Sequence, residues 1–169
     1  WIQASYTPIK DMNGTPFKVV KYATDVTKEK LINADYQGQI QAISKAQAVI
    51  QFELDGTITT ANDNFLSVLG YTLDEIKGRH HSMFVEPEYK NSVDYTNFWQ
   101  ALNRGEHQIG EFKRLGKGGK EVWIQASYSP ILDLNGRPFK VVIYAMEITA
   151  QKGALSEVEG RQLLSDYGI

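Results

Sequence analysis

The alternation of apolar and polar residues predicts a compact unit of strands and helices in the second two thirds of the chain. Runs rich in β-branched and aromatic residues predict five strands, over residues 48–54, 57–61, 108–115, 121–132 and 139–148. Between the second and third of these strands, capping residues and apolar spacing predict helices over 64–69, 72–76 and 88–102. Two strands, a helical middle and three strands predict an α+β domain, with one antiparallel sheet and helices on one of its faces.

A segment of 27 residues occurs twice, at 1–27 and 123–149, with 19 identical positions. Each copy contains two strand-like runs separated by an Asn-Gly turn signal, at Asn13-Gly14 and Asn135-Gly136, which predicts a β-hairpin. Because self-similarity sets the domain count, we expect residues 48–150 to be a complete domain and residues 1–27 to be the C-terminal hairpin of a preceding one. A lone hairpin is marginally stable, so it needs a partner: the complete domain, the connector or another chain.

Residues 28–47 are expected to form a helical linker, since they contain no proline and their apolar residues recur at spacings of three and four. Gly38 is its weakest point. Two interpretations stay open: a helix packed on its own domain, and a helix that pairs with a second copy in a coiled-coil-like dimer. At the other end, residues 151–169 are expected to be either an exit helix or an appended tail.

Composition narrows the class of protein. The 169 residues are 42% hydrophobic, carry a net charge of −2 and include no Cys, which excludes disulfides, thiolate metal sites and cysteine nucleophiles. The near-neutral balance does not favour nucleic-acid binding, which uses a clustered basic surface. There is no signal peptide and no apolar run of the length that a membrane span needs, so we expect this fragment to be cytoplasmic and free of membrane segments.

Residues 48–149 resemble a PAS domain. The resemblance is carried by LDG at 54–56, AN at 61–62, FLSVLGY at 65–71, EIKG at 75–78 and EIT at 147–149, which corresponds to the D-x-T exit motif of the family. It implies a PAS fold with a five-stranded antiparallel sheet in the order 2-1-5-4-3, followed or preceded by connector helices, and a partial second PAS domain in residues 1–27. The complete copy departs from the exit motif at Glu147, where the partial copy keeps Asp25.

The stretches GRHHSMFV and FKRLGKGGKEVWIQASYSPI are similar to the tandem PAS modules of bacterial methyl-accepting chemotaxis proteins and aerotaxis-like receptors. This resemblance implies a non-enzymatic sensor that binds a small molecule, or a gas through haem, and relays the change through its flanking helices. It also implies a homodimer formed through the linker helix or the sheet, and a downstream coiled-coil signalling domain in the parent receptor. The alternative is a cofactor-free PAS module that serves protein–protein interaction or dimerisation.

His80 and His81 are the strongest candidates for site chemistry, because a neutral imidazole can ligate haem iron through one ring nitrogen. If haem b is the cofactor, either histidine is a candidate iron ligand. Phe84 would then furnish part of an apolar wall, and Trp123 or Tyr144 could donate a hydrogen bond to bound oxygen. The alternative for both histidines is a structural role, such as capping a helix or binding a backbone carbonyl.

Enzymatic motifs are missing from the sequence. It contains no G-x-S-x-G, no H-E-x-x-H and no phosphate-binding loop, so we expect no catalytic activity. The glycine-rich residues 116–119 join two expected strands and therefore predict a hairpin turn instead of an anion-binding loop. A photoreceptor-type flavin site would need a reactive Cys, which leaves only non-covalent flavin as a further possibility.

Overall fold

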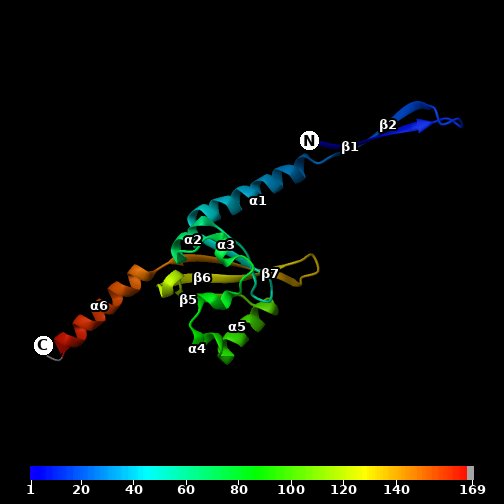
Figure 1. The fold of residues 1–169 in the computed structure, drawn as a ribbon. Coiled ribbons are helices and arrows are strands. Elements are labelled where there is room, and N and C mark those ends of the chain that lie inside the picture. The colour runs from blue at the N-terminus through cyan, green and yellow to red at the C-terminus, as the bar shows by residue number, and fades with distance from the viewer. Residues whose placement is uncertain (167–169) are drawn as a thin grey trace. The chain divides into compact units, whose positions relative to one another are not determined.

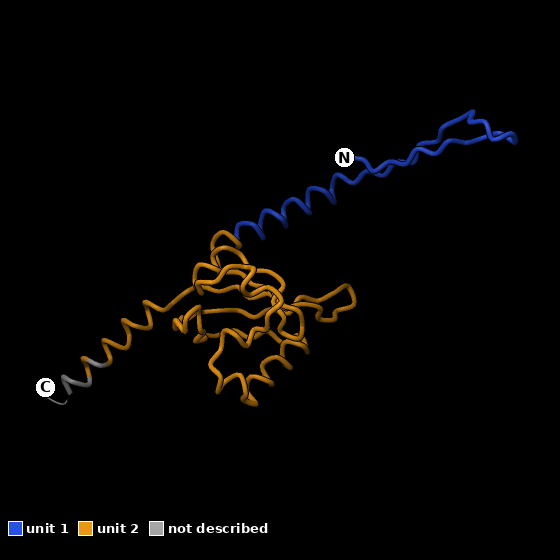
Figure 2. The backbone as a smooth tube through the Cα atoms, in the orientation of Figure 1, with its two compact units in different colours: residues 1–43 blue, residues 44–169 orange. Residues whose placement is uncertain are grey.

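The computed structural model describes residues 1–166 and consists of two compact units, residues 1–43 and the remainder from Ser44 onward (Figure 2). The first unit contains strands β1 (Ile2–Lys10) and β2 (Pro16–Asp25) and most of helix α1 (Thr27–Ala46). The last three residues of the predicted tail, 167–169, lie outside the described residues.

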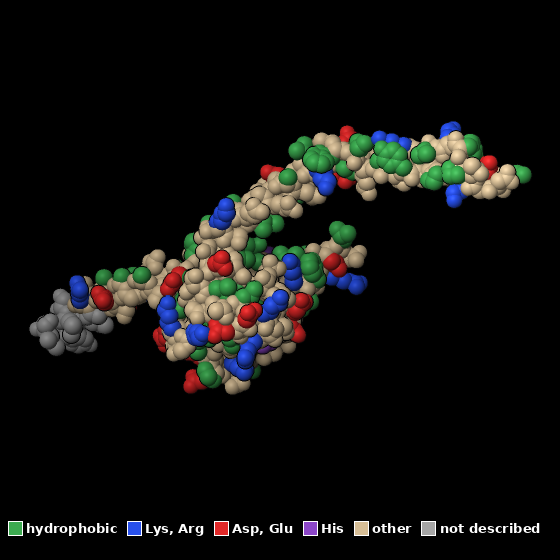
Figure 3. Space-filling model, turned by 45° about the horizontal axis from the view of Figure 1, so that its top comes forward, with side chains coloured by type: hydrophobic (Ala, Val, Ile, Leu, Met, Phe, Trp, Pro, Cys, Tyr) green, Lys and Arg blue, Asp and Glu red, His purple; other side chains and the backbone are tan. Residues whose placement is uncertain are grey.

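β1 and β2 pair antiparallel as a separate two-stranded sheet, which confirms the predicted hairpin. Its turn is fixed by Asp11, whose carboxylate accepts hydrogen bonds from the backbone of Asn13 and Thr15, and by Gly14 at φ +82°. Nearly every side chain of the two strands is exposed, and hydrophobic side chains are visible along the surface of this unit (Figure 3).

α1 runs unbroken through Gly38 over 20 residues, so the predicted weak point does not interrupt the helix. It has no buried residue. The final residues of α1, from Ser44, belong to the second unit. There two asparagine side chains bind the carbonyls at the end of the helix. Asn62 Nδ2 donates to the carbonyls of Ser44 and Gln47, and Asn64 Nδ2 donates to the carbonyl of Lys45.

The second unit is built around a five-stranded antiparallel sheet (Figure 1). Its strands are β3 (Ala48–Phe52), β4 (Ile58–Ala61), β5 (Gln108–Leu115), β6 (Glu121–Leu132) and β7 (Pro138–Glu147). They lie in the order β4-β3-β7-β6-β5, which is 2-1-5-4-3 when they are counted along this unit. The α+β class predicted from the sequence is confirmed.

Short helices connect β4 to β5 and cover one face of the sheet. They are α2 (Asp63–Leu69), α3 (Leu73–Ile76), the 3-10 helix η1 (His81–Phe84), α4 (Pro87–Lys90) and α5 (Val93–Asn103). The single helix predicted over 88–102 was wrong, because Ser92 starts a new helix inside it. The Ser92 hydroxyl accepts the Tyr95 N–H as an N-cap and donates to the Tyr89 carbonyl at the end of α4.

The core lies between these helices and the inward face of the sheet. Alternate residues of β6 point to it, namely Val122, Ile124, Ala126 and Tyr128, and the helices contribute Phe65, Leu69, Ile76, Phe84, Tyr95, Trp99 and Leu102. The predicted turn at 116–119 is confirmed as the connection of β5 to β6, and includes the short 3-10 helix η2 (Lys117–Gly119).

Helix α6 (Thr149–Asp166) leaves the end of β7 directly. Its first turn is attached to β6 because the Ile148 N–H donates to the Trp123 carbonyl and the Thr149 hydroxyl accepts the Trp123 N–H. The residues expected as an exit helix or a tail are therefore helical as far as Asp166. Within the described part of the chain, no helix combines the length and the apolar character that a membrane crossing requires.

Candidate functional site

The two neighbouring histidines point in different directions. His80 is exposed and is the N-cap of η1: its Nδ1 accepts the Ser82 N–H at 3.1 Å, and its Nε2 lies 2.8 Å from the Asp55 carbonyl oxygen. Since a carbonyl only accepts, Nε2 carries the hydrogen and the ring is neutral in this arrangement. His80 thus holds η1 against the β3–β4 turn. A side chain at Gly56 in that turn would lie 2.5 Å from His80 Nε2.

His81 is buried in the core, with 1% of its surface exposed. Both of its ring nitrogens have partners: Nδ1 lies 2.9 Å from the Tyr95 hydroxyl and Nε2 lies 3.2 Å from the Tyr128 hydroxyl. Its ring stacks on Tyr95 and meets the rings of Phe52 and Trp99 edge-on. The imidazole is therefore packed on all sides by aromatic rings from β3, α5 and β6.

The hydrogen-bond pattern assigns the tautomer of His81. The Tyr128 hydroxyl accepts two N–H groups of Arg114, from Nη2 at 2.7 Å and from Nε at 3.2 Å, so its own hydrogen is directed to His81 Nε2. His81 then donates from Nδ1 to Tyr95. Burial lowers the pKa of His81 well below 6.5, and the positive charge of Arg114 acts in the same direction. His81 is therefore a neutral imidazole near pH 7.

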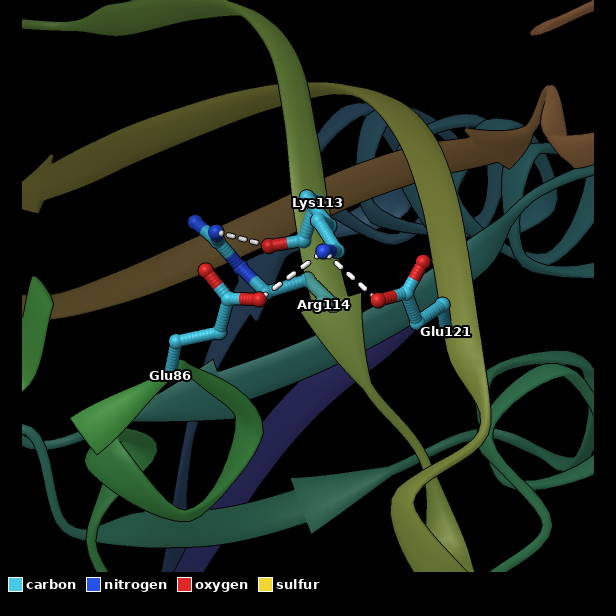
Figure 4. Close-up of polar contacts among 4 residues, drawn as sticks. All are labelled: Glu86, Lys113, Arg114 and Glu121. Carbon is cyan, nitrogen blue, oxygen red and sulfur yellow. Dashed lines mark hydrogen bonds and ion pairs between the residues drawn. The ribbon is translucent and has the colours of Figure 1, made fainter. Parts of the chain in front are cut away.

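Arg114 connects this cluster to the edge strand β5. It is 5% exposed, and its Nη1 donates to the carbonyl of the preceding residue, Lys113, at 2.8 Å (Figure 4). The side chain of Lys113 binds the carboxylates of Glu86 and Glu121, at 2.8 and 2.6 Å, on either side of the strand. These contacts raise the pKa of Lys113 to about 12. Two neighbouring cations of β5 thus have opposite surroundings, because Lys113 is paired with acids and Arg114 is not.

A small cavity lies where the helices meet the sheet. It is lined by Phe52, Phe65, Leu69, His81, Phe84, Arg114, Ile124, Tyr128 and Ile143. Its volume is about 10 Å³, which is room for about one water molecule. The lining is apolar except for His81, Arg114 and Tyr128, so any polar group that enters it would meet those three side chains.

The structure brings together only part of the predicted site. His81 and Phe84 line the cavity, and His80 lies outside its lining. Trp123 and Tyr144 are half-buried and alternate with the cavity residues Ile124 and Ile143 along their strands, so they belong to the opposite face of the sheet. Trp123 instead lies under the ammonium group of Lys152 from α6, 5.1 Å from its ring centre.

Haem does not fit the residues as they are arranged. Both nitrogens of His81 are engaged by tyrosine hydroxyls, both nitrogens of His80 bind the backbone, and the cavity is far smaller than a porphyrin. Across the residues that the structure describes, no group of three or more His, Cys, Asp or Glu side chains could hold a metal ion.

Sequence reasoning missed Tyr95, Tyr128 and Arg114, which complete the polar cluster around His81. A signal for Arg114 was present, because it has the same parity as Phe112 along the expected strand 108–115, on the side that faces the core. A charged residue at an inward position is a strong indication of a functional or a specifically paired group. Tyr128 likewise shares the parity of Ile124 and Ala126.

Comparison with known proteins is consistent with this architecture. A family model described as the PAS fold matches residues 58–145. The biofilm dispersion protein BdlA of Pseudomonas aeruginosa is 40% identical over 149 residues, which are 88% of this chain and 36% of that protein. The aerotaxis receptor of Escherichia coli is 35% identical over 80 residues, which are 47% of this chain and 16% of the receptor. The chain thus spans about a third or less of these curated relatives.

Solved structures show the same fold at low sequence identity. A PAS domain from Colwellia psychrerythraea has a TM-score of 0.59 at 22% identity and covers 68% of this chain and 98% of its own. A light-oxygen-voltage domain studied with a flavin analogue has a TM-score of 0.57 at 23% identity, with 73% and 96% covered. At these identities the likeness concerns the fold alone.

Proposed function

The chain belongs to the PAS family, and on that premise we propose that residues 48–150 are the sensory module of a chemotaxis-type receptor. In this proposal a small ligand changes the packing around His81, and the flanking helices α1 and α6 transmit the change. One observation carries it: His81, Tyr95, Tyr128 and Arg114 form a buried hydrogen-bonded cluster at the wall of the cavity. Buried polar clusters of this kind are rigid when satisfied and costly when disturbed, which suits a two-state element.

Both flanking helices are bound to elements that line the cavity. α2 contributes Phe65 and Leu69 to the lining, and its N-cap, Asn62, holds the end of α1. β6 contributes Ile124 and Tyr128, and the start of the same strand holds the first turn of α6 through the backbone of Trp123. A ligand-driven shift of α2 or β6 therefore has a short covalent and hydrogen-bonded route to each helix.

The similarity to the aerotaxis receptor and to BdlA supports a place in chemotaxis-type signalling. We further propose that the parent receptor has a coiled-coil signalling domain beyond this module, and that the module works in the cytoplasm. Catalysis is not part of the proposal. The polar groups of the cavity have no carboxylate among them that could act as a base, and His81 is closed off by its two tyrosine partners.

Hydrogen exchange tests the relay. Tyr128→Phe removes one hydroxyl from the cluster and keeps the aromatic ring, and we expect faster amide exchange at the Ile148 and Lys152 N–H groups, which start α6. Tyr6→Phe, at the equivalent position of the first hairpin, is the matched control and should leave α6 unchanged. If Tyr128→Phe alters exchange only within the core and never in α6, the proposed relay is refuted.

A second function, dimerisation without a cofactor, is favoured by α1. Its apolar residues Ile32, Tyr36, Ile40 and Ile43 recur at spacings of four, four and three, yet they are between 42% and 61% exposed. We expect the chain to be a dimer by light scattering, and Ile32→Gln with Ile40→Gln to give the mass of a monomer. Asn33→Gln, on a different face of α1, is the control. A monomeric wild type at high concentration would rule out α1 as a dimer helix.

We also propose that β1 and β2 are the last two strands of a second PAS domain in a tandem array. Every pair in their register recurs in β6 and β7 at a constant offset, including the irregularity at Ile9/Lys10 and at Ile131/Leu132. A chimera tests this: a copy of residues 44–122 placed ahead of Trp1 would supply the missing strands and helices. We expect Trp1 fluorescence to shift to the blue and the β1–β2 amides to gain protection; an unchanged Trp1 spectrum would count against the assignment.

A further inference from the structure

Arg114 is a buried cation, and among the residues that the structure describes it forms no ion pair with an acid. It is 5% exposed, and the ion pairs among the described residues involve Arg104, Lys113, Lys117, Lys152 and Arg161 but not Arg114. Taking a charge out of water is costly unless an opposite charge or good hydrogen bonds replace the water. The missing anion is therefore an unusual feature that calls for a reason.

The groups to which Arg114 donates hydrogen bonds are neutral. Nε and Nη2 both donate to one oxygen, the Tyr128 hydroxyl, and Nη1 donates to the Lys113 carbonyl. The guanidinium also lies 4.8 Å from the ring centre of Phe112. The Nε/Nη2 edge is the one that pairs in parallel with the two oxygens of a carboxylate, and here a single hydroxyl occupies it.

The neighbourhood contains more donors than acceptors. His81 uses its one free lone pair to accept from Tyr128, so it offers no acceptor to Arg114. No Asp or Glu lines the cavity. A ligand that brings acceptor oxygens and a negative charge would complement this set of side chains better than a neutral or cationic one.

Arg114 also lines a groove on the surface of the second unit. The groove is open, has a volume of about 300 Å³ and lies at the outer edge of β5, where two acids, Glu86 and Glu111, and one further cation, Lys113, also line it. The Arg114 side chain therefore lies between this groove and the cavity. Its Nε and Nη2 contacts to Tyr128 are buried, and its Nη1 contact to the Lys113 carbonyl is part-buried.

We propose that Arg114 and the cavity behind it form a binding site for a small carboxylate, which takes the Nε/Nη2 edge of the guanidinium. The inference rests on the proposed sensory function and deepens it by naming the ligand class. Because the cavity as it stands has room for about one water molecule, the carboxylate can enter only by taking the place of the Tyr128 hydroxyl on Arg114. Tyr128 and its partner His81 then rearrange, and the disturbance reaches η1 and β6 from one binding event.

The repeated hairpin supports a special role for a cation beside Tyr128. Of the eight positions at which segments 1–27 and 123–149 differ, one is buried in the second copy: Ile143, which lines the cavity, and its counterpart is Lys21. In the first hairpin the Lys21 ammonium lies 5.3 Å from the ring centre of Tyr6, the counterpart of Tyr128. A cation beside this tyrosine thus occurs twice, supplied from two different strands.

Formate, the smallest carboxylate, is the probe for the test. Thermal unfolding of the whole chain is followed in potassium formate for the wild type, Arg114→Met and Arg104→Met. Arg104 is an exposed arginine paired with Glu106, and its variant controls for the loss of a guanidinium. At ten times the dissociation constant we expect formate to raise the melting temperature of the wild type and of Arg104→Met by about 5 °C beyond any rise in Arg114→Met.

Equal responses of the wild type and Arg114→Met would overturn the proposal, because they would report a general salt effect. If Arg114→Met does not fold, the wild type alone decides: the ¹⁵N resonance of Arg114 Nε must shift on titration with formate and saturate, and a resonance that stays in place overturns the site. A negative result with formate does not refute the relay, since hydrogen exchange in Tyr128→Phe is measured without formate. Failure of the relay with a saturable formate response would instead leave a site that does not signal.

Discussion

The hairpins β1–β2 and β6–β7 have nearly the same sequence and the same register, but opposite surroundings. Tyr128 is fully buried and its counterpart Tyr6 is 64% exposed; Val141 is fully buried and its counterpart Val19 is 62% exposed. In the second unit β3 and β5 pair with the two outer edges of the hairpin, and the helices cover one of its faces. The strand pairing is thus a property of the local sequence, whereas burial is supplied by segments far away along the chain.

The largest difference in unfolding free energy between the two hairpins is expected at Tyr128 and its counterpart Tyr6. Tyr128→Ala should lower the free energy of unfolding of the second unit by about 4–5 kcal/mol, since it opens a cavity in the core and also leaves Arg114 and His81 without a partner. Tyr6→Ala, the same change in the first hairpin, should cost less than about 0.5 kcal/mol because the side chain is exposed.

Denaturant unfolding followed by the near-ultraviolet signal of the second unit measures both variants. The control is Tyr128→Phe, which keeps the ring and should account for the hydroxyl alone. A loss of similar size in Tyr6→Ala and Tyr128→Ala would mean that the first hairpin is buried against a partner in solution, and the contrast between the two copies would disappear.

Exchanging Ile143 and its counterpart Lys21 sharpens the comparison, because Ile143 is the one buried residue among the positions at which the two hairpins differ. Ile143→Lys puts a second cation beside Arg114 in the cavity, and we expect a loss of about 3 kcal/mol or more in unfolding free energy. Lys21→Ile, the reciprocal change, should alter stability by less than about 0.5 kcal/mol, since Lys21 is exposed. Circular dichroism melts of the two variants give the values, and Ile143→Val, which stays apolar, is the control. A tolerated Ile143→Lys would show that the cavity accepts charge without a ligand.

The elements of the fold were predictable because their signals are local. Alternation, Asn-Gly turns and capping residues placed the five strands, the hairpin at 1–27 and most helices within a few residues. The break at Ser92 was missed although its signal is local: Asn91 and Ser92 are weak helix formers, and the Ser92 hydroxyl binds Tyr89 and Tyr95, three residues away on either side.

The candidate site was only partly predictable, because its members meet through long-range packing. The sequence indicated His81, but its partners Tyr95 and Tyr128 are 14 and 47 residues away on α5 and β6. Trp123 and Tyr144 can donate hydrogen bonds and were therefore predicted to face the ligand, whereas the alternation along their strands assigns them to the other face of the sheet. Residue type alone could not separate the two faces; the alternation beside Ile124 and Ile143 could have done so.

A pH titration distinguishes the two units, because residues 1–43 contain no histidine. The folded-state pKa of His81 is lowered well below 6.5, so the unfolded chain takes up a proton first as the pH falls. The stability that neutral His81 contributes is therefore present above about pH 6.5 and is progressively lost as the pH falls below it. Urea unfolding of the second unit at several pH values measures this slope. His81→Phe should flatten it, and an equal slope in that variant would assign the effect to other groups.

The smallest expected effect concerns the helices that follow the two hairpins. In α6, Lys152 lies over the Trp123 ring and forms an ion pair with Glu111 of β5; in α1, its counterpart Lys30 has no β5 beside it to supply such an acid within its unit. Lys152→Gln should therefore cost about 0.5 kcal/mol, since the pair is partly exposed, and should speed exchange in the first turn of α6. Lys30→Gln should leave exchange in α1 unchanged. If Lys152→Gln and Lys30→Gln behave alike, the first turn of α6 is held only by Thr149 and by backbone hydrogen bonds, and both of these contacts occur in the two copies. The edge strand β5 would then add nothing to the attachment of α6.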